Sequence, residues 1–179
     1  HPRERLHPIG TARFARLGLA RSTVHVAWNA GAAESEPPEW LEPGTGLLYP
    51  SPHAQLLETL PSEARPERLL VLDGTWHTAK TLYRDKHWLH QLPHYRLAPE
   101  QPGRYRLRRE PRHDYVSTIE AIVEALGILE PETPGLQELL RAFDAMIDLQ
   151  IDLASERKGD KRTRKRRRPK GMRRIPHAL

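Results

Sequence analysis

The chain of 179 residues contains no cysteine, which excludes disulfide bonds, thiolate metal sites and cysteine nucleophiles. It also lacks any apolar run close to the roughly 20 residues that a membrane-spanning helix needs. The N-terminus shows no basic, then apolar, then small-residue pattern of a secretory signal. The ten histidines are scattered and lack the spacing of a zinc site, so we expect no bound metal. These absences favour a soluble, cytoplasmic protein that does not bind a membrane.

Positive charge is concentrated at the C-terminal end. Residues 155–179 hold twelve Lys or Arg and two acidic residues, whereas the rest of the chain holds 17 basic and 21 acidic residues. A block such as Arg164-Lys165-Arg166-Arg167 repels itself and gains affinity for a polyanion by releasing counterions. We therefore predict one domain over residues 1–154 and a disordered basic tail over residues 155–179 that contacts nucleic acid. A nuclear-localisation or solubility role for the tail is the alternative.

The apolar pattern predicts strands that alternate with helices. Short apolar or alternating runs predict strands at Arg21–Trp28, Leu47–Pro50, Leu69–Leu72 and Tyr95–Ala98. Helical spacing predicts helices at Gln55–Leu60, Thr75–Tyr83, Ser117–Gly127 and from about Gly135 onward. The continuously apolar run Leu69–Leu72 is typical of a central strand covered on both faces. The alternation indicates an α/β domain with a mostly parallel sheet and flanking helices, in which ligands bind at the carboxyl ends of the strands.

Two helices carry further sequence signals. Ser117-Thr118-Ile119-Glu120 has the form of a capping box, which starts a helix, and Gly127 is placed to end that helix. In the last predicted helix, apolar residues recur at helical spacing from Leu136 to Ile151. Such a stripe belongs to a core or to an oligomer interface, which leaves a monomer and a homodimer both open.

The end of the third predicted strand is a candidate site. Asp73 follows four apolar residues and precedes Gly74, so a carboxylate lies where the chain turns tightly into a helix. Asp73 either acts on a ligand or only caps that helix. Trp76 is either a core anchor or a platform for a stacked base. Lys80, one turn further on, either meets phosphate or is solvated.

A second candidate site is the arginine-rich segment Arg104–Tyr115, which leads into the capped helix. It holds five arginines and two tyrosines, a composition suited to an anion and to RNA, although an ordinary solvated loop is the alternative. In an extended chain, Arg106 and Arg108 point to one side and Arg109 to the other.

These motifs together resemble the DTW-domain family of tRNA-uridine aminocarboxypropyltransferases, which is named for an Asp-x-Thr-Trp motif. That motif is here Asp73-Gly74-Thr75-Trp76. The resemblance extends to four other segments in family order, and together they span roughly residues 1–150. These are His1-Pro2-Arg3-Glu4, Gly10-Thr11-Ala12-Arg13, Leu48-Tyr49-Pro50, and Tyr105–Pro111 with the following Ser117–Ala121.

The resemblance implies a SPOUT-like fold with a C-terminal knot that binds the cofactor S-adenosylmethionine. It further implies transfer of the 3-amino-3-carboxypropyl group of this cofactor to N3 of a tRNA uridine. Many family members carry a cysteine cluster near the N-terminus, which this chain lacks, so no zinc site is carried over. The alternatives are methyl transfer from the same cofactor on the same fold, and a non-catalytic RNA-binding protein.

The resemblance also assigns site residues. Asp73 is the catalytic candidate, either as a general base or as a group that orients the uracil. The cofactor-binding candidates are Tyr49, Pro50, Leu72, Gly74, Thr75, Trp76, Leu107, Arg109, Pro111, Ser117 and Thr118. The RNA-binding candidates follow from the basic residues themselves, the tail included, and not from the resemblance alone; they are Arg3, Arg13, Lys80, Arg106, Arg108, Arg164, Lys165, Arg166 and Arg167.

Overall fold

In the described part of the chain, four parallel strands form a sheet at the centre of the fold. The structure is a computed structural model that describes residues 11–27, 34–98 and 116–166, the last stretch as backbone alone at residue 154 and over residues 156–166. The strands are β1 (Thr45–Leu48), β2 (Gln55–Leu56), β3 (Arg68–Val71) and β4 (His94–Arg96). They are arranged in the order β2-β4-β1-β3, and each neighbouring pair is parallel. The predicted α/β class with a mostly parallel sheet is confirmed.

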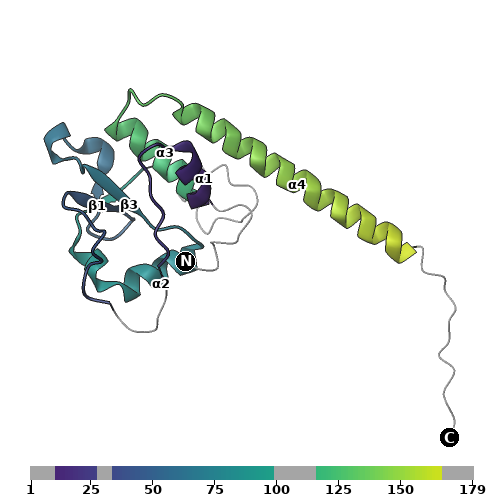
Figure 1. The fold of residues 1–179 in the computed structure, drawn as a ribbon, viewed down its shortest axis with the longest axis horizontal. Coiled ribbons are helices and arrows are strands. Elements are labelled where there is room, and N and C mark those ends of the chain that lie inside the picture. Colours follow the sequence, from purple (N-terminus) through teal and green to yellow (C-terminus); the bar gives the residue numbers. More distant parts are fainter. Residues whose placement is uncertain (1–10, 28–33, 99–115, 167–179) are drawn as a thin grey trace, which may run out of the picture.

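Helices and short 3-10 turns connect and cover these strands (Figure 1). The helices are α1 (Thr11–Gly18), α2 (Trp76–Asp85), α3 (Thr118–Leu129) and α4 (Leu136–Arg166). The 3-10 turns are η1 (Leu57–Thr59), η2 (Ser62–Ala64) and η3 (His87–Gln91). The strands predicted near Leu47, Leu69 and Tyr95 and the helices predicted after Asp73, Ser117 and Gly135 are therefore present.

Both faces of the sheet are covered, because successive side chains of a strand point to opposite faces. Leu48 and Val71 pack with Ala125 of α3 on one face. Leu47 and Leu70 pack with Trp88 of η3 on the other face. The prediction that β3 is covered on both faces is thus confirmed. The prediction that it is central is wrong, because β3 is the edge strand of the described sheet, next to β1.

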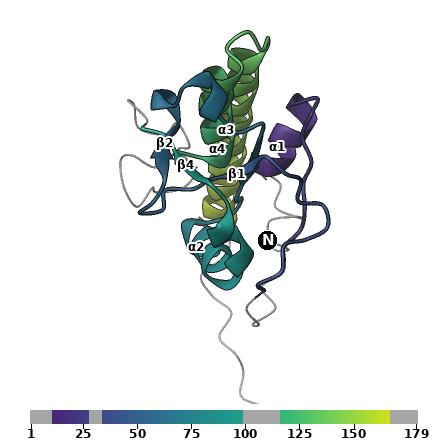
Figure 2. The same ribbon diagram turned by 90° about the vertical axis from the view of Figure 1, so that its left-hand side faces the viewer.

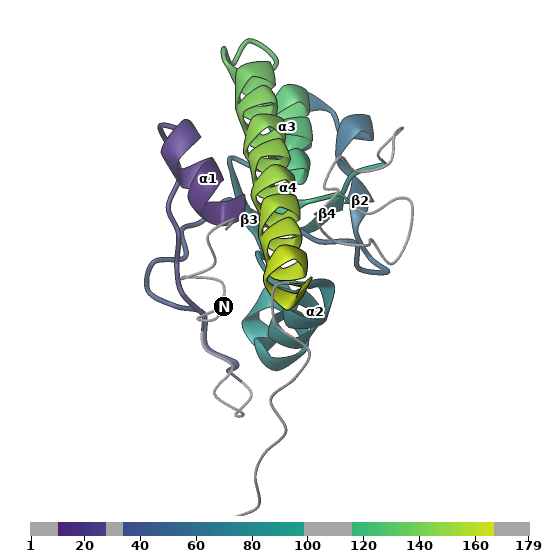
Figure 3. The same ribbon diagram turned by 90° about the vertical axis from the view of Figure 1, so that its right-hand side faces the viewer.

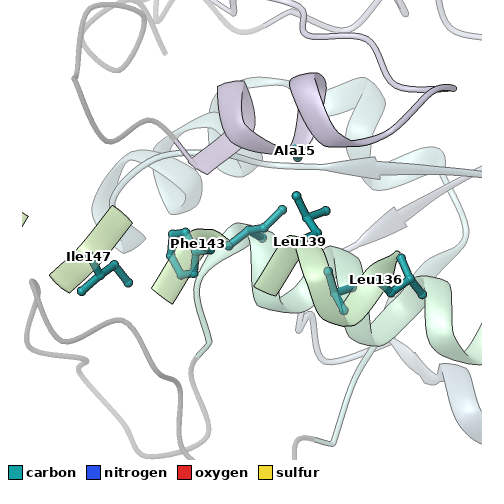
Figure 4. Close-up of a cluster of buried hydrophobic side chains, with 7 residues drawn as sticks. Ala15, Leu136, Leu139, Phe143 and Ile147 are labelled. Atoms are coloured by element: carbon teal, nitrogen blue, oxygen red, sulfur yellow. The ribbon is translucent and has the colours of Figure 1, made fainter. Parts of the chain in front are cut away.

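The helices α1 and α4 pack on α3, on the side away from the sheet (Figures 2 and 3). Phe143 and Ile147 of α4 are fully buried there with Ala15 of α1 and Ile119 of α3 (Figure 4). Burying an apolar side chain of this size stabilises the fold by about 1.5–3 kcal/mol. The first half of the predicted stripe on α4 is therefore core. Beyond Ile147 the helix leaves the body of the domain, and Leu149 is 57% exposed (Figure 1).

Glu34, which precedes β1 in the chain, is bound to the residues at the end of α2. The backbone N–H of Glu34 donates to the carbonyl of Asp85 (2.9 Å), and His87 N–H donates to the carbonyl of Glu34 (2.7 Å). The buried Lys86 forms an ion pair with the Glu34 carboxylate. Next to it, the hydrogen bond from the Arg84 guanidinium (2.6 Å) lowers the pKa of Asp85.

Three local predictions were wrong. Residues 21–27 form no strand, and Val24 is 51% exposed, because no described strand pairs with this segment. The helix predicted at Gln55–Leu60 is strand β2 followed by η1, because Gln55 and Leu56 pair with β4. Gly127 does not end α3, which continues to Leu129 because the residues after the glycine still pack against the sheet.

The basic segment also differs from its prediction. The α4 backbone is helical to Arg166, so the predicted disorder is not confirmed for residues 155–166. The division of the chain into a domain and a tail at residue 154 stays a prediction. The predicted C-terminal knot also stays a prediction, because nothing in the described residues tests it. Within the described ranges, no helix is both long enough and apolar enough to cross a membrane.

Candidate functional site

The predicted site lies at the carboxyl edge of the parallel sheet. Strand β1 ends at Leu48 and leads into Tyr49, and β3 ends at Val71 and leads into Leu72 and Asp73. Because β1 and β3 pair in parallel with Leu48 opposite Val71, these two exits are neighbours. Ligands of open parallel sheets bind outside this edge.

Asp73 is held by a residue from the other end of the domain. The Thr11 hydroxyl donates a hydrogen bond of 2.7 Å to Oδ1 of Asp73, and both side chains are half-buried. Thr11 is the first residue of α1, so the positive end of that helix lies beside the carboxylate. A hydrogen bond to an ionised carboxylate is stronger than one between neutral groups. One oxygen of Asp73 is therefore fixed in place.

The cap of α2 is Thr75, not Asp73. The Thr75 hydroxyl oxygen accepts a hydrogen bond of 3.1 Å from the backbone N–H of Thr78. The interpretation of Asp73 as the helix cap is therefore wrong. Gly74 between them has a φ of 145°, a conformation that side chains with a Cβ rarely adopt. Three residues of the motif thus have different structural roles. Asp73 accepts a hydrogen bond from Thr11, Gly74 allows the chain to turn, and Thr75 caps the helix.

The aromatic residues near this edge differ in burial. Trp76, in the first turn of α2, is 36% exposed, so the interpretation as a core anchor does not hold. Tyr49 is half-buried, and its ring stacks on Tyr83 of α2 at a centroid distance of 4.3 Å and an angle of 21°. The Tyr49 N–H donates to the carbonyl of Tyr95 (2.8 Å), which extends the β1–β4 pairing by one residue. Pro50 is exposed, and Leu72 packs under the edge.

The predicted capping box at the start of α3 is confirmed. The Glu120 carboxylate accepts from the Ser117 N–H (2.8 Å), and the Ser117 hydroxyl accepts from the Glu120 N–H (3.4 Å). Thr118 beside them is half-buried. Helix α1, which carries Thr11, packs against α3. The cofactor roles of Ser117 and Thr118 stay predictions.

Other predicted site residues are exposed or lie outside the described residues. Arg13 on α1 and Lys80 on α2 are exposed, as phosphate contacts require. The candidates at Arg3, Arg106, Leu107, Arg108, Arg109, Pro111 and Arg167 lie outside the described residues. Arg164, Lys165 and Arg166 belong to the backbone of α4, and their side chains are not described.

Three polar residues that form hydrogen bonds in this region were not predicted from the sequence: Thr11, Ser51 and His94. Thr11 lies in the Gly10–Arg13 motif, but nothing local links it to Asp73. The buried Ser51 and His94 form a hydrogen bond of 2.7 Å between Oγ and Nδ1. Ser51 directly follows the Tyr49-Pro50 motif, which was the one available signal.

Two open hollows of about 570 and 580 Å³ lie in the described part of the molecule. The first is lined by His53, Tyr83, His90 and His94, and the second by residues around Gly46. Both include residues at or just before the amino ends of strands, and the first also includes Tyr83, which stacks on Tyr49. Across the described residues, no three His, Asp or Glu side chains gather closely enough to hold a metal ion.

The DTW domain family model matches residues 1–151 of the chain. The tRNA-uridine aminocarboxypropyltransferase 2 of Drosophila melanogaster is 30% identical over 157 residues, which cover 85% of this chain and 62% of that protein. The protein of the same name from Macaca fascicularis is 27% identical, with 84% and 53% covered. The chain thus spans about half to three fifths of the length of these relatives. No solved structure matches the chain significantly. Since the family model covers most of its length, the chain belongs to the DTW domain family.

Proposed function

We propose that this protein is a tRNA-uridine aminocarboxypropyltransferase, which moves the 3-amino-3-carboxypropyl group of S-adenosylmethionine to N3 of a uridine. The names of its relatives support this proposal. The observation that carries it is the Asp73 carboxylate, which lies at the carboxyl edge of the sheet, is bound to Thr11 and is not used as a helix cap. The proposal includes tRNA as the partner, the cytoplasm as the location and a SPOUT-like fold with a C-terminal knot.

Asp73 is the group that acts on the uridine in this proposal. The reaction forms a bond from N3 to the transferred carbon and breaks the bond from that carbon to sulfur, so methylthioadenosine leaves and the N3 proton must go to a base. Thr11 holds Oδ1 of Asp73, and Oδ2 accepts the N3 proton or the hydrogen bond from N3–H. S-adenosylmethionine, when bound, would supply a sulfonium centre, from which the neutral thioether methylthioadenosine is a good leaving group. Positioning by the protein therefore provides much of the rate.

The residues at this edge fit a nucleoside-bearing donor. Gly74 has no Cβ and lets a ligand approach the backbone. The start of α2 directs a positive dipole end to the same edge, which suits an amino acid carboxylate. Trp76, which is 36% exposed, is an aromatic side chain of the kind on which a base stacks. Tyr49, Pro50, Ser117 and Thr118 complete the described part of the proposed cofactor site.

Differential labelling of the cofactor tests the reaction. The protein is incubated with tRNA and with S-adenosylmethionine labelled either in the methyl carbon or in the aminocarboxypropyl carbons. We expect only the aminocarboxypropyl label to enter RNA, and the methyl label to appear in methylthioadenosine. Methyl label entering RNA would indicate a methyltransferase instead. Binding of tRNA without transfer of either label would indicate a non-catalytic RNA-binding protein.

A pair of matched variants tests the role of Asp73. Asp73→Asn keeps the size of the side chain but removes its ability to take a proton, and we expect a loss of about 10²- to 10⁴-fold in kcat. Asp85→Asn makes the same change at the far end of α2, where the carboxylate pairs with Arg84, and is expected to keep wild-type kcat. Equal rates for Asp73→Asn and wild type, with the fold intact, would remove Asp73 from proton transfer.

A further inference from the structure

Ser51 and His94 form a buried polar pair that the proposed mechanism does not use. The two residues are 6% and 8% exposed. The distance from Ser51 Oγ to His94 Nδ1 is 2.7 Å, and that from His94 Nε2 to the carbonyl oxygen of Leu89 is 2.9 Å. Because a carbonyl only accepts, Nε2 carries a hydrogen. In the neutral ring Nδ1 then accepts from the Ser51 hydroxyl, so both nitrogens are satisfied.

The serine of this pair fixes the turn that follows β1. The Ser51 N–H donates to the carbonyl of Tyr49 (2.7 Å), which closes a three-residue turn around Pro50. The Ser51 carbonyl in turn accepts from the Ala54 N–H (3.1 Å). Strand β4, which carries His94, also accepts from Tyr49 N–H through the Tyr95 carbonyl. The turn is thus fastened to β4 at Tyr49 through its backbone and at Ser51 through a side chain.

The histidine also supports the ring of Tyr49. His94 lies edge-on to Tyr83, with ring centroids 5.6 Å apart and an angle of 64°. Tyr83 in turn stacks on Tyr49 at 4.3 Å. The His94 ring is therefore connected to Tyr49 in two ways. It bonds to Ser51, two residues after Tyr49, and it contacts Tyr83, which stacks on the Tyr49 ring.

We infer that Ser51 and His94 are positioning residues that hold the Tyr49–Pro50 turn in the conformation that binds the nucleoside part of the donor. This inference rests on the proposed function for the ligand, but the hold on the turn is a property of the free protein. A turn that is already ordered loses little conformational freedom when a ligand binds, so the pair raises affinity without touching the ligand.

The variant Ser51→Ala removes the hydroxyl and leaves the rest of the site in place. Two measurements follow: hydrogen exchange of the Tyr49, Ser51 and Ala54 amides in the free protein, and the Kd and KM for S-adenosylmethionine. We expect faster exchange at these amides, a rise of about fivefold to tenfold in Kd and KM, and a kcat within about twofold of wild type. Should Ser51→Ala fail to fold, Ser51→Cys, with a weaker donor of similar size, is expected to give a smaller change of the same sign.

A matched control separates positioning from general destabilisation. Val123→Ala makes a cavity in the cluster of α1, α3 and α4, away from the turn, and is expected to lower the melting temperature while leaving the exchange of the turn and the KM unchanged. Unchanged exchange in Ser51→Ala, or a KM no different from that of Val123→Ala, would overturn the inference. A wild-type protein that neither binds nor uses S-adenosylmethionine would overturn the proposed function and the ligand part of this inference. The exchange experiment decides separately whether the pair holds the turn.

Discussion

At the scale of single residues, Thr11 and Asp73 form a contact between distant parts of the chain at the proposed site. They are separated by 62 positions and joined by one hydrogen bond. Removing the hydroxyl leaves the carboxylate without its donor and frees its side chain to rotate. The bond therefore contributes both to stability and to the orientation of Asp73.

The first prediction concerns Thr11→Val, which keeps the shape of the side chain and removes the donor. We expect a loss of about 1–2 kcal/mol in the free energy of unfolding, because a hydrogen bond to a charged group is removed at a half-buried position. Urea unfolding measures this loss. Thr11→Ser keeps a hydroxyl and should stay close to wild type. A Thr11→Val protein as stable as wild type would show that the bond contributes nothing.

The second prediction concerns Gly74→Ala. Gly74 has a φ of 145°, so a Cβ there is strained by about 1–3 kcal/mol. Thermal unfolding should show a lower melting temperature, and the turn that presents Asp73 should shift. An unchanged melting temperature for Gly74→Ala would mean that the backbone at this position adopts a φ that residues with a Cβ also adopt.

At the scale of elements, α3 shows that the sequence predicted the start of a helix correctly and its end incorrectly. Its start was predicted correctly, because the capping box lies within four consecutive residues from Ser117 to Glu120. Its end was not, because Gly127 is only a possible stop. Ile128 and Leu129 continue the helix by packing against the sheet.

The third prediction follows from that difference. Gly127 lies inside α3, is exposed, and a Cβ added there meets nothing within 4 Å. Gly127→Ala should therefore stabilise the protein by about 0.5–1 kcal/mol, since alanine restricts the unfolded chain and favours the helix. Chemical denaturation measures the gain. A loss of stability would instead fit a glycine that terminates the helix, as the sequence alone suggested.

At the scale of the whole molecule, α4 joins the core to the basic segment. Its first half packs on α1 and α3 through Phe143 and Ile147. Its second half carries the positive charge away from the body of the domain (Figure 1). Stability and RNA affinity should therefore depend on different parts of the same helix.

The fourth prediction tests this separation by removing residues 155–179. We expect the melting temperature to change little, because the α4 residues that are buried in the described part of the chain, Leu136 to Ile147, precede this segment. Affinity for tRNA should fall, and log K should depend less steeply on log salt, by about 0.7–0.9 for each phosphate that the shortened protein no longer neutralises. Replacing Arg164, Lys165 and Arg166 with Gln keeps the length and should give a smaller change in the same direction. An unchanged salt dependence would exclude the segment from RNA binding.

The sequence by itself determined the features that depend on neighbouring residues. Apolar runs located β1, β3 and β4, the capping box located the start of α3, and Asp73 was placed at the exit of a strand. The Asp-x-Thr-Trp motif and its companions also indicated the family. Each of these signals lies within a few consecutive residues, where spacing and local hydrogen bonding leave few choices.

Only the tertiary structure decided how these pieces meet. It placed β3 at the edge, made Gln55 and Leu56 a strand by pairing them with β4, and left residues 21–27 without a partner strand in the described sheet. It also assigned the cap of α2 to Thr75, so that Asp73 is held by Thr11. Pairings across many residues depend on which surfaces pack together, and a local pattern does not carry that information. The position of Asp73 is thus a property of the sequence, whereas the orientation of its carboxylate is a property of the fold.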